Sequence, residues 1–142
     1  MTTTARWELP GDVSSPARAR ELVRGLLAEH PESAELTDDA ALLVSEVVAN
    51  VVVHAHTDAR LTARVGEHRV RIEVEDASPR LPVIAPLDAD DLRVRGRGLS
   101  LVERVALAWG IERRAGGKVV WFELGAPAHS PSGRRSADYV AG

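Results

Sequence analysis

The sequence predicts an α/β sandwich, with helices packed on one face of a mixed, mostly antiparallel sheet. The main reason is the order of its segments, which reads strand, helix, helix, strand, strand, long connection, helix, strand, strand. The predicted strands alternate apolar and charged residues, as half-buried strands do. A doubly wound dinucleotide fold is disfavoured because strands and helices do not alternate and no GxGxxG follows the first strand.

The composition suits one folded domain of a chain of 142 residues, 44% of them hydrophobic. A net charge of −3 gives no overall basic signature for nucleic acid. The absence of cysteine excludes disulfides, zinc–thiolate sites and cysteine nucleophiles. No apolar run reaches the roughly 18 residues of a membrane span, and the N-terminal segment lacks the apolar region of a signal peptide. We therefore expect a cytoplasmic protein that contacts neither membrane nor nucleic acid directly.

The first elements are a short strand and a helix. Ala5 to Leu9 forms the strand, and Pro10 ends it. Ser15 is expected to cap a helix that has Pro16 in its first position. That helix carries apolar residues at helical spacing and ends at His30.

The second helix is predicted from about Asp39 to His56, with Thr37 or Asp38 as its N-cap. Its apolar part, Leu42 to His56, is interrupted every four residues by Glu46, Asn50 and His54. Its many valines favour a strand by propensity. Its length decides otherwise, because it has no glycine or proline and exceeds the ~3–10 residues of most strands. We therefore expect a buried helix with three polar side chains on one face.

A hairpin follows, in which two strands run from Leu61 to Val65 and from Val70 to Glu75. Asp76 falls in phase with the apolar residues of the second strand, so its side chain should face the core where that strand ends. Residues 77–95 show no period, and a connection of that length in a compact domain is usually a functional loop, a lid or disordered.

The remaining folded part starts at Gly96-Arg97-Gly98, which opens a helix predicted to end at Trp109-Gly110. A hairpin closed around Gly116-Gly117 joins the last two strands. The domain is thus expected at residues 5–125. Residues 126–142 are rich in proline, serine and glycine and predict a disordered tail.

Glu46 and Asn50 would lie about 6 Å apart along a helix axis, close enough to act on one ligand. An asparagine oxygen suits a hard cation such as Mg²⁺, and a nearby carboxylate can act as a base. Alternatively, the two residues are a buried polar pair satisfied by backbone groups or by a dimer partner. His54 is expected to be a structural residue or to contact the residues that bind the ligand, not to bind a metal itself.

Two further places have the chemistry of a nucleotide site. Asp76 could accept a hydrogen bond from an exocyclic amine such as that of adenine; alternatively, it forms the turn before Ser78-Pro79. Gly96-Arg97-Gly98 offers free N–H groups at a helix start, and Arg95 adds positive charge for phosphates. The alternative for this glycine segment is a hinge of the lid.

Taken together, these segments resemble the Bergerat-fold ATP-binding domain of the GHKL superfamily, and most closely its anti-sigma-factor serine kinases, from about Trp7 to Leu124. Residues 46–54 look like the N box of that family, and residues 74–76 look like its G1 box. Residues 95–102 look like its G2 box, and residues 117–124 resemble its final strand.

The resemblance implies ATP and Mg²⁺ as cofactors. It implies that Glu46 is the catalytic base, that Asn50 holds Mg²⁺ and that Asp76 meets the adenine amino group. The residues implied to lie beside the phosphates are Arg95, Gly96, Arg97, Gly98 and Leu99.

The function implied is that of a homodimeric anti-sigma factor that sequesters a sigma factor and phosphorylates a serine of a STAS-type anti-anti-sigma protein. One departure from the family pattern motivates an alternative. The family G1 box carries glycines after its aspartate, whereas Ala77, Ser78 and Pro79 follow Asp76 here. The alternative is a catalytically weak or inactive Bergerat-fold module that sequesters a regulatory partner.

Overall fold

The computed structural model describes residues 2–79, 98–125 and 138–139. In chain order its elements are β1 (Thr3–Leu9), α1 (Ser15–Leu27), the 3-10 segment η1 (Pro31–Leu36), α2 (Thr37–Asn50), the π-helical turn η2 (Val51–Ala55), β2 (Ala59–Gly66), β3 (Arg69–Asp76), α3 (Gly98–Val105), β4 (Ala108–Arg114), β5 (Gly117–Gly125) and β6 (Asp138–Tyr139). The sheet order is β1-β2-β3-β5-β4-β6, and every neighbouring pair is antiparallel except the parallel pair β4 and β6.

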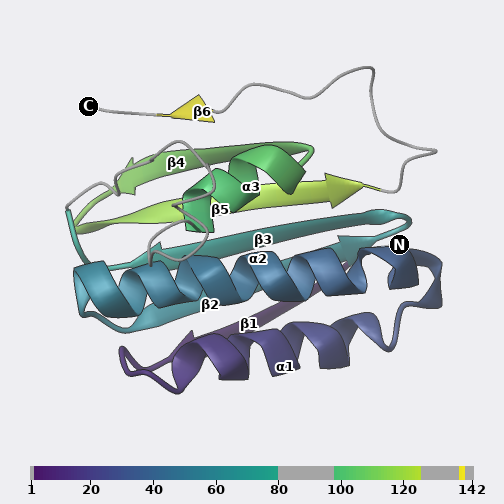
Figure 1. The fold of residues 1–142 in the computed structure, drawn as a ribbon, viewed down its shortest axis with the longest axis horizontal. Coiled ribbons are helices and arrows are strands. Elements are labelled where there is room, and N and C mark those ends of the chain that lie inside the picture. The colour runs from purple at the N-terminus through teal and green to yellow at the C-terminus, as the bar shows by residue number, and fades with distance from the viewer. Residues whose placement is uncertain (1, 80–97, 126–137, 140–142) are drawn as a thin grey trace, which may run out of the picture.

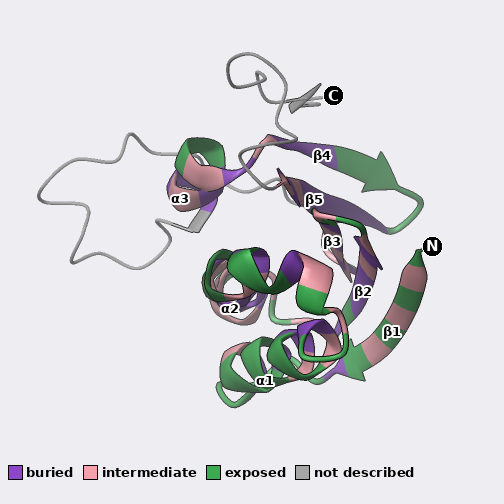
Figure 2. Ribbon diagram, turned by 90° about the vertical axis from the view of Figure 1, so that its right-hand side faces the viewer, coloured by how far each residue is buried: buried purple, intermediate pink, exposed green. Residues whose placement is uncertain are grey.

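The three α-helices cover one face of this sheet (Figures 1 and 2). The other face of the strands carries no helix among the described residues (Figure 2). The predicted α/β sandwich with a mostly antiparallel sheet is therefore confirmed.

The core lies between the helices and the sheet. On the sheet side it consists of rows of residues that run across neighbouring strands. Val74 of β3 lies opposite both Leu61 of β2 and Val120 of β5. One step along the sheet, Ile72 lies opposite Phe122, and both are fully buried. This row pattern positions the site, because the next pair on the same face of the sheet beyond Val74 and Val120 is the polar pair Asp76 and Lys118.

The predicted helix is confirmed as α2, and 7 of its 14 residues are buried. The N-cap position is held by Leu36 without a side-chain hydrogen bond, so the predicted capping by Thr37 or Asp38 is wrong. The segment does not continue as an α-helix to His56, however. After Asn50 the chain widens into the π-helical turn η2, which closes with a hydrogen bond from the His56 N–H to the Val51 carbonyl, and His56 adopts a left-handed conformation. Consecutive β-branched valines are poorly accommodated in an α-helix, which is consistent with the change of geometry here. Such π-turns often occur at functional sites.

Two further predicted helix ends are wrong. The helix α1 starts at Ser15 itself, and the Ser15 hydroxyl donates to the Pro10 carbonyl instead of capping the helix. The helix α3 ends at Val105, whereas Trp109 and its neighbours form β4. Trp109 lies opposite Phe122 and is buried in the core. Pairing with β5 therefore overrides the helical spacing of the apolar residues before it.

Two predictions fall largely outside the described residues. Of the connection predicted at residues 77–95, the structure describes only residues 77–79. Of the predicted disordered tail, it describes only Asp138 and Tyr139, which pair with Gly110 and Ile111 of β4.

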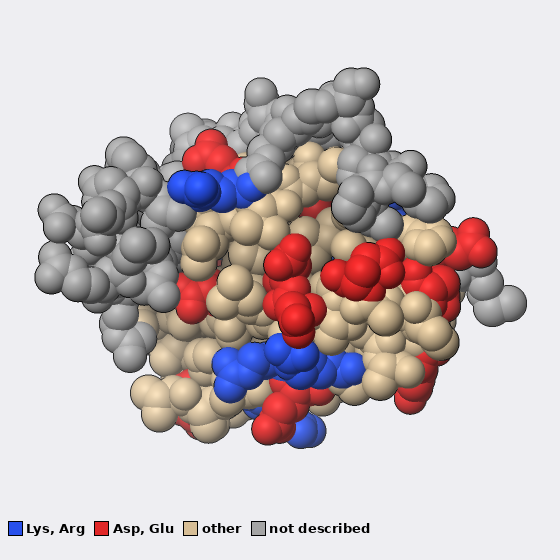
Figure 3. Space-filling model, turned by 45° about the vertical axis from the view of Figure 1, so that its right-hand side comes forward, with Lys and Arg blue, Asp and Glu red and all other residues tan. Residues whose placement is uncertain are grey.

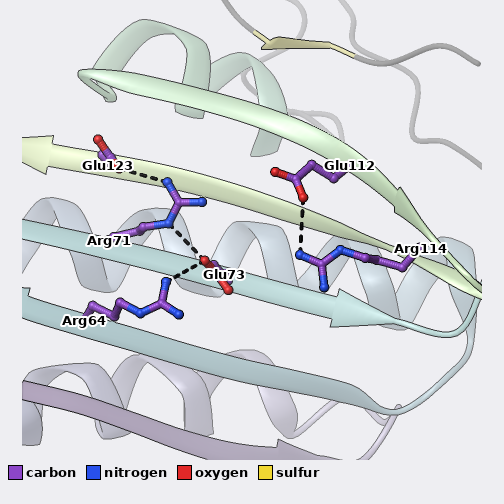
Figure 4. Close-up of polar contacts among 6 residues, drawn as sticks. All are labelled: Arg64, Arg71, Glu73, Glu112, Arg114 and Glu123. Atoms are coloured by element: carbon purple, nitrogen blue, oxygen red, sulfur yellow. Dashed lines mark hydrogen bonds and ion pairs between the residues drawn. The ribbon is translucent and has the colours of Figure 1, made fainter.

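The open face of the sheet carries a network of ion pairs (Figure 4). Glu73 of β3 accepts hydrogen bonds from Arg64 at 2.8 Å and from Arg71 at 2.9 Å. Arg71 also donates to Glu123 at 2.8 Å, and its guanidinium lies 4.3 Å from the ring centre of Trp121. On the face drawn in Figure 3, basic side chains likewise lie against acidic ones. The described residues of that face form no uninterrupted basic surface.

This network predicts a pH dependence of stability. Burial raises the pKa of Glu73, but hydrogen bonding to Arg71 and the charges of Arg64 and Arg71 outweigh it, so the pKa is lower than usual. A carboxyl whose pKa is lowered by folding stabilises the protein above the pKa of the unfolded state, about 4.3, and that stabilisation is lost as the pH falls through the folded-state pKa.

We expect Glu73→Gln to lower the free energy of unfolding by about 1 kcal/mol at pH 7 and by much less at pH 3. Chemical denaturation at the two pH values measures the difference. Glu112→Gln is the control, because Glu112 and its partner Arg114 are both half-exposed. An equal effect of Glu73→Gln at both pH values would show that charge is not the cause.

Candidate functional site

A pocket of about 410 Å³, including its open mouth, lies beside the C-terminal end of α2. It is bounded by α2 and η2, by the start of α3, and by the ends of β3 and β5 that meet in the sheet. Its apolar walls come from Val47, Val51, Leu99 and Val120, and its polar groups come mainly from Asn50, His54, Asp76 and Lys118. A pocket with apolar walls and a few polar groups is typical of a small-molecule site.

Asp76 forms the polar end of this pocket. Asp76 is 4% exposed, which confirms the prediction that its side chain faces inward at the end of β3. Its Oδ1 accepts a hydrogen bond of 2.8 Å from the Ser78 N–H. The turn-forming alternative is therefore also correct, because one carboxylate both faces the pocket and holds the turn that follows.

Lys118 is the site residue that the sequence interpretation missed. It lies opposite Asp76 in the pairing of β3 with β5, and its Nζ lies 3.0 Å from each carboxylate oxygen. Oδ1 accepts a hydrogen bond from Nζ, whereas Oδ2 receives none of normal geometry. The signal was present in the strand pattern, because Lys118 is in phase with the core-facing Val120 and Phe122.

The polar residues of the second helix are not all at the pocket. Asn50 and His54 line it, although His54 is exposed. Glu46 is half-buried, lies one helical turn before Asn50 and is not part of the pocket lining. The expected spacing of Glu46 and Asn50 on one α-helix is confirmed, since both lie within α2.

The segment predicted to bind phosphates is described only in part. Gly98 starts α3, and Leu99 is buried and lines the pocket. Arg95, Gly96 and Arg97 lie outside the described residues.

Comparison with known proteins identifies the family. Residues 9–124 match the model of the histidine kinase-like ATPase domain. The chain belongs to this family. A relative in Streptomyces coelicolor, the uncharacterized protein SCO4941, is 33% identical over 92 residues, which are 62% of this chain and 84% of the relative.

Two solved structures share the fold of this histidine kinase-like ATPase domain. The structure of the RsbU and RsbW domains of Rv1364c from Mycobacterium tuberculosis matches with a TM-score of 0.65 and 21% identity, over 98% of this chain. This chain spans only 35% of that one. The SiaB–SiaC complex from Pseudomonas aeruginosa matches with a TM-score of 0.56 and 16% identity, over 84% of this chain and 88% of the other. These matches confirm the expected Bergerat-type fold.

Family membership implies ATP with Mg²⁺ as the ligand class, and the pocket fits it in two respects. The buried Oδ2 of Asp76 lacks a well-directed donor, which an exocyclic amine could supply. Asn50 offers an amide oxygen in the same pocket. The described residues contain no group of three or more His, Cys, Asp or Glu that could hold a metal ion. A magnesium ion at Asn50 would therefore need oxygens from the nucleotide as well.

None of the helices in the described part of this ATPase-family chain has the length and apolar character of a membrane span.

Proposed function

We propose that this protein is an ATP-dependent serine/threonine kinase that acts in partner switching. It would phosphorylate a STAS-domain anti-anti-sigma protein and, in its other state, sequester a sigma factor. The observation that carries the proposal is one pocket in a histidine kinase-like ATPase domain that brings the buried Asp76 carboxylate and the Asn50 amide together. Support for the partner class comes from the two structural neighbours, whose names include RsbW domains and the SiaB–SiaC complex.

The proposed roles are those that the family resemblance implies for each residue, and the pocket supports those of Asp76 and Asn50. Asp76 accepts a hydrogen bond from the adenine amino group at the inner end of the pocket. Asn50 would hold Mg²⁺ through its amide oxygen, and the ion would supply positive charge beside the phosphates. Glu46 takes the proton of the acceptor hydroxyl. The hydroxyl oxygen of the acceptor bonds to the γ-phosphorus, and the bond between the γ-phosphorus and the bridging oxygen breaks and releases ADP. Arg95, Gly96, Arg97, Gly98 and Leu99 bind the phosphate side. The working form is proposed to be a cytoplasmic homodimer that does not bind nucleic acid directly.

Incubation with Mg-ATP and a STAS-domain protein encoded beside its gene tests this proposal. We expect phosphate transfer to a serine of that protein, and a loss of about 100-fold or more in Glu46→Ala and in Asn50→Ala. Asp39→Ala is the matched control, because Asp39 is an exposed acidic residue in the first turn of the same helix. Undiminished transfer by Asn50→Ala would show that the metal assignment is wrong.

A second candidate function is a binding module that sequesters a partner without catalysis. Two observations favour it. The run Asp76-Ala77-Ser78-Pro79-Arg80 lacks the glycines of the family pattern DxGxG, and Lys118 already forms an ion pair with Asp76. Calorimetric titration with ATP and ADP discriminates between the two functions. Tight, Mg²⁺-dependent binding would contradict the binding-module alternative.

A further inference from the structure

The pocket contains the only lysine of the chain. Of the 18 lysine and arginine residues, 17 are arginine, and the exception is Lys118. Its side chain is 7% exposed, whereas the side chains of Arg60, Arg69 and Arg114 are about half exposed. A buried ammonium needs a counter-charge, and the two Asp76 oxygens at 3.0 Å supply it.

The position of Nζ has a consequence for any ligand that uses Asp76. Oδ1 already accepts two hydrogen bonds, from the Ser78 N–H and from Nζ. Oδ2 is buried, and Nζ lies 3.0 Å from it without good hydrogen-bond geometry. A ligand amine that donated to this carboxylate would have to enter the space next to Oδ2 and compete there with the ammonium group. Lys118 thus presents to Asp76 the same chemistry as an exocyclic amine, which is an N–H donor, but with a full positive charge.

The lysine side chain is a flexible four-carbon stem with a compact charge. The side chain lines the pocket, so a ligand that enters the pocket meets it directly. A base that replaced it would also cover the apolar walls formed by Val51, Leu99 and Val120.

We propose that Lys118 is an internal competitor for the base-binding carboxylate, so that an adenine base binds Asp76 only after the ammonium has left it. This inference rests on the proposed function, because it takes nucleotide as the ligand of the pocket. Lys118 then sets the affinity for nucleotide, and its ammonium group pairs with Asp76 whenever no nucleotide is bound. If the ammonium leaves Asp76 in only 1–10% of molecules, the apparent affinity for ATP falls by about tenfold to a hundredfold.

The first test compares Lys118→Met with the wild type by calorimetric titration. The variant should bind ATP about tenfold to a hundredfold more tightly. Binding of tripolyphosphate, which lacks the base, should not change. Arg113→Met is the matched control, because Arg113 lies opposite Lys118 on β4 but is exposed, and it should leave both affinities unchanged. The gain should vanish in Asp76→Ala/Lys118→Met, because the gain depends on the freed carboxylate.

A second measurement uses the wild-type protein, so it does not depend on how well a variant folds. Because the chain has one lysine, labelling with lysine that carries ¹⁵N at Nζ reports on Lys118 alone. In a protein prepared without a lysine-containing tag, saturating ATP should shift the Nζ signal to that of an ammonium no longer bound to a carboxylate. Tripolyphosphate should leave the signal in place.

The outcomes separate this inference from the proposed function. If Lys118→Met binds ATP no more tightly than the wild type, or the Nζ signal persists unchanged with ATP bound, the inference is overturned while nucleotide binding stands. If affinity rises as expected but no phosphate reaches a STAS protein, Lys118 is a competitor and the kinase proposal fails. If neither protein binds adenine nucleotides, both are overturned.

Discussion

Asp76→Ala is expected to lower the free energy of unfolding by about 3–5 kcal/mol, because it leaves the Lys118 ammonium buried without a counter-charge. The side chains of Lys118 and Asp76 are only 7% and 0% exposed, so little water reaches the ammonium in its observed position. The variant also loses the acceptor of the Ser78 N–H, which loosens the turn after β3. Urea denaturation followed by circular dichroism measures the loss.

Two variants show whether the cost comes from the stranded charge. Glu75→Ala removes the preceding carboxylate, which is 38% exposed and 3.9 Å from Arg60, and should change stability by less than about 1 kcal/mol. Asp76→Leu/Lys118→Met removes both charges of the buried pair and should recover most of the stability lost in Asp76→Ala. If Asp76→Ala proves as mild as Glu75→Ala, the ion pair is not a structural element of the pocket.

Gly117→Ala is expected to cost about 3 kcal/mol, because no space exists for a methyl group between β3 and β5. A Cβ built on Gly117 would lie 2.0 Å from the carbonyl oxygen of Asp76 and 3.1 Å from the Cα of Ala77. Both contacts are to backbone atoms, so relief requires the two strands to separate. The separation would occur beside Asp76 and Lys118, so this variant should also weaken nucleotide binding.

Gly25→Ala serves as the comparison for that variant. It lies within α1, and a Cβ there meets nothing within 4 Å. Alanine in the middle of a helix is favoured over glycine by roughly 0.5–1 kcal/mol, so this change should stabilise the protein. Thermal and urea denaturation should therefore give changes in the free energy of unfolding of opposite sign for the two variants. A Gly117→Ala protein as stable as the wild type would show that the strands can move apart at little cost.

Much of the fold could be predicted because it depends on local periods. The alternation in residues 61–65 and 70–75 predicted β2 and β3 and the inward direction of Asp76, since successive side chains of a strand point to opposite faces. The length of the segment around Glu46 and Asn50 predicted α2. The end of α3 could not be predicted, because the apolar residues from Val105 to Trp109 suit a helix or a strand, and only pairing with β5 decides.

The site divides in the same way. The sequence by itself determined that Asp76 and Lys118 each face the core, because each is in phase with the apolar residues of its own strand. Only the tertiary structure decided that they face each other, since β3 and β5 are 42 residues apart at this point and are not consecutive strands. The register of β3 against β5 is set by core contacts along both strands. These contacts join residues that are distant in the sequence, so the alternation within one strand cannot predict them.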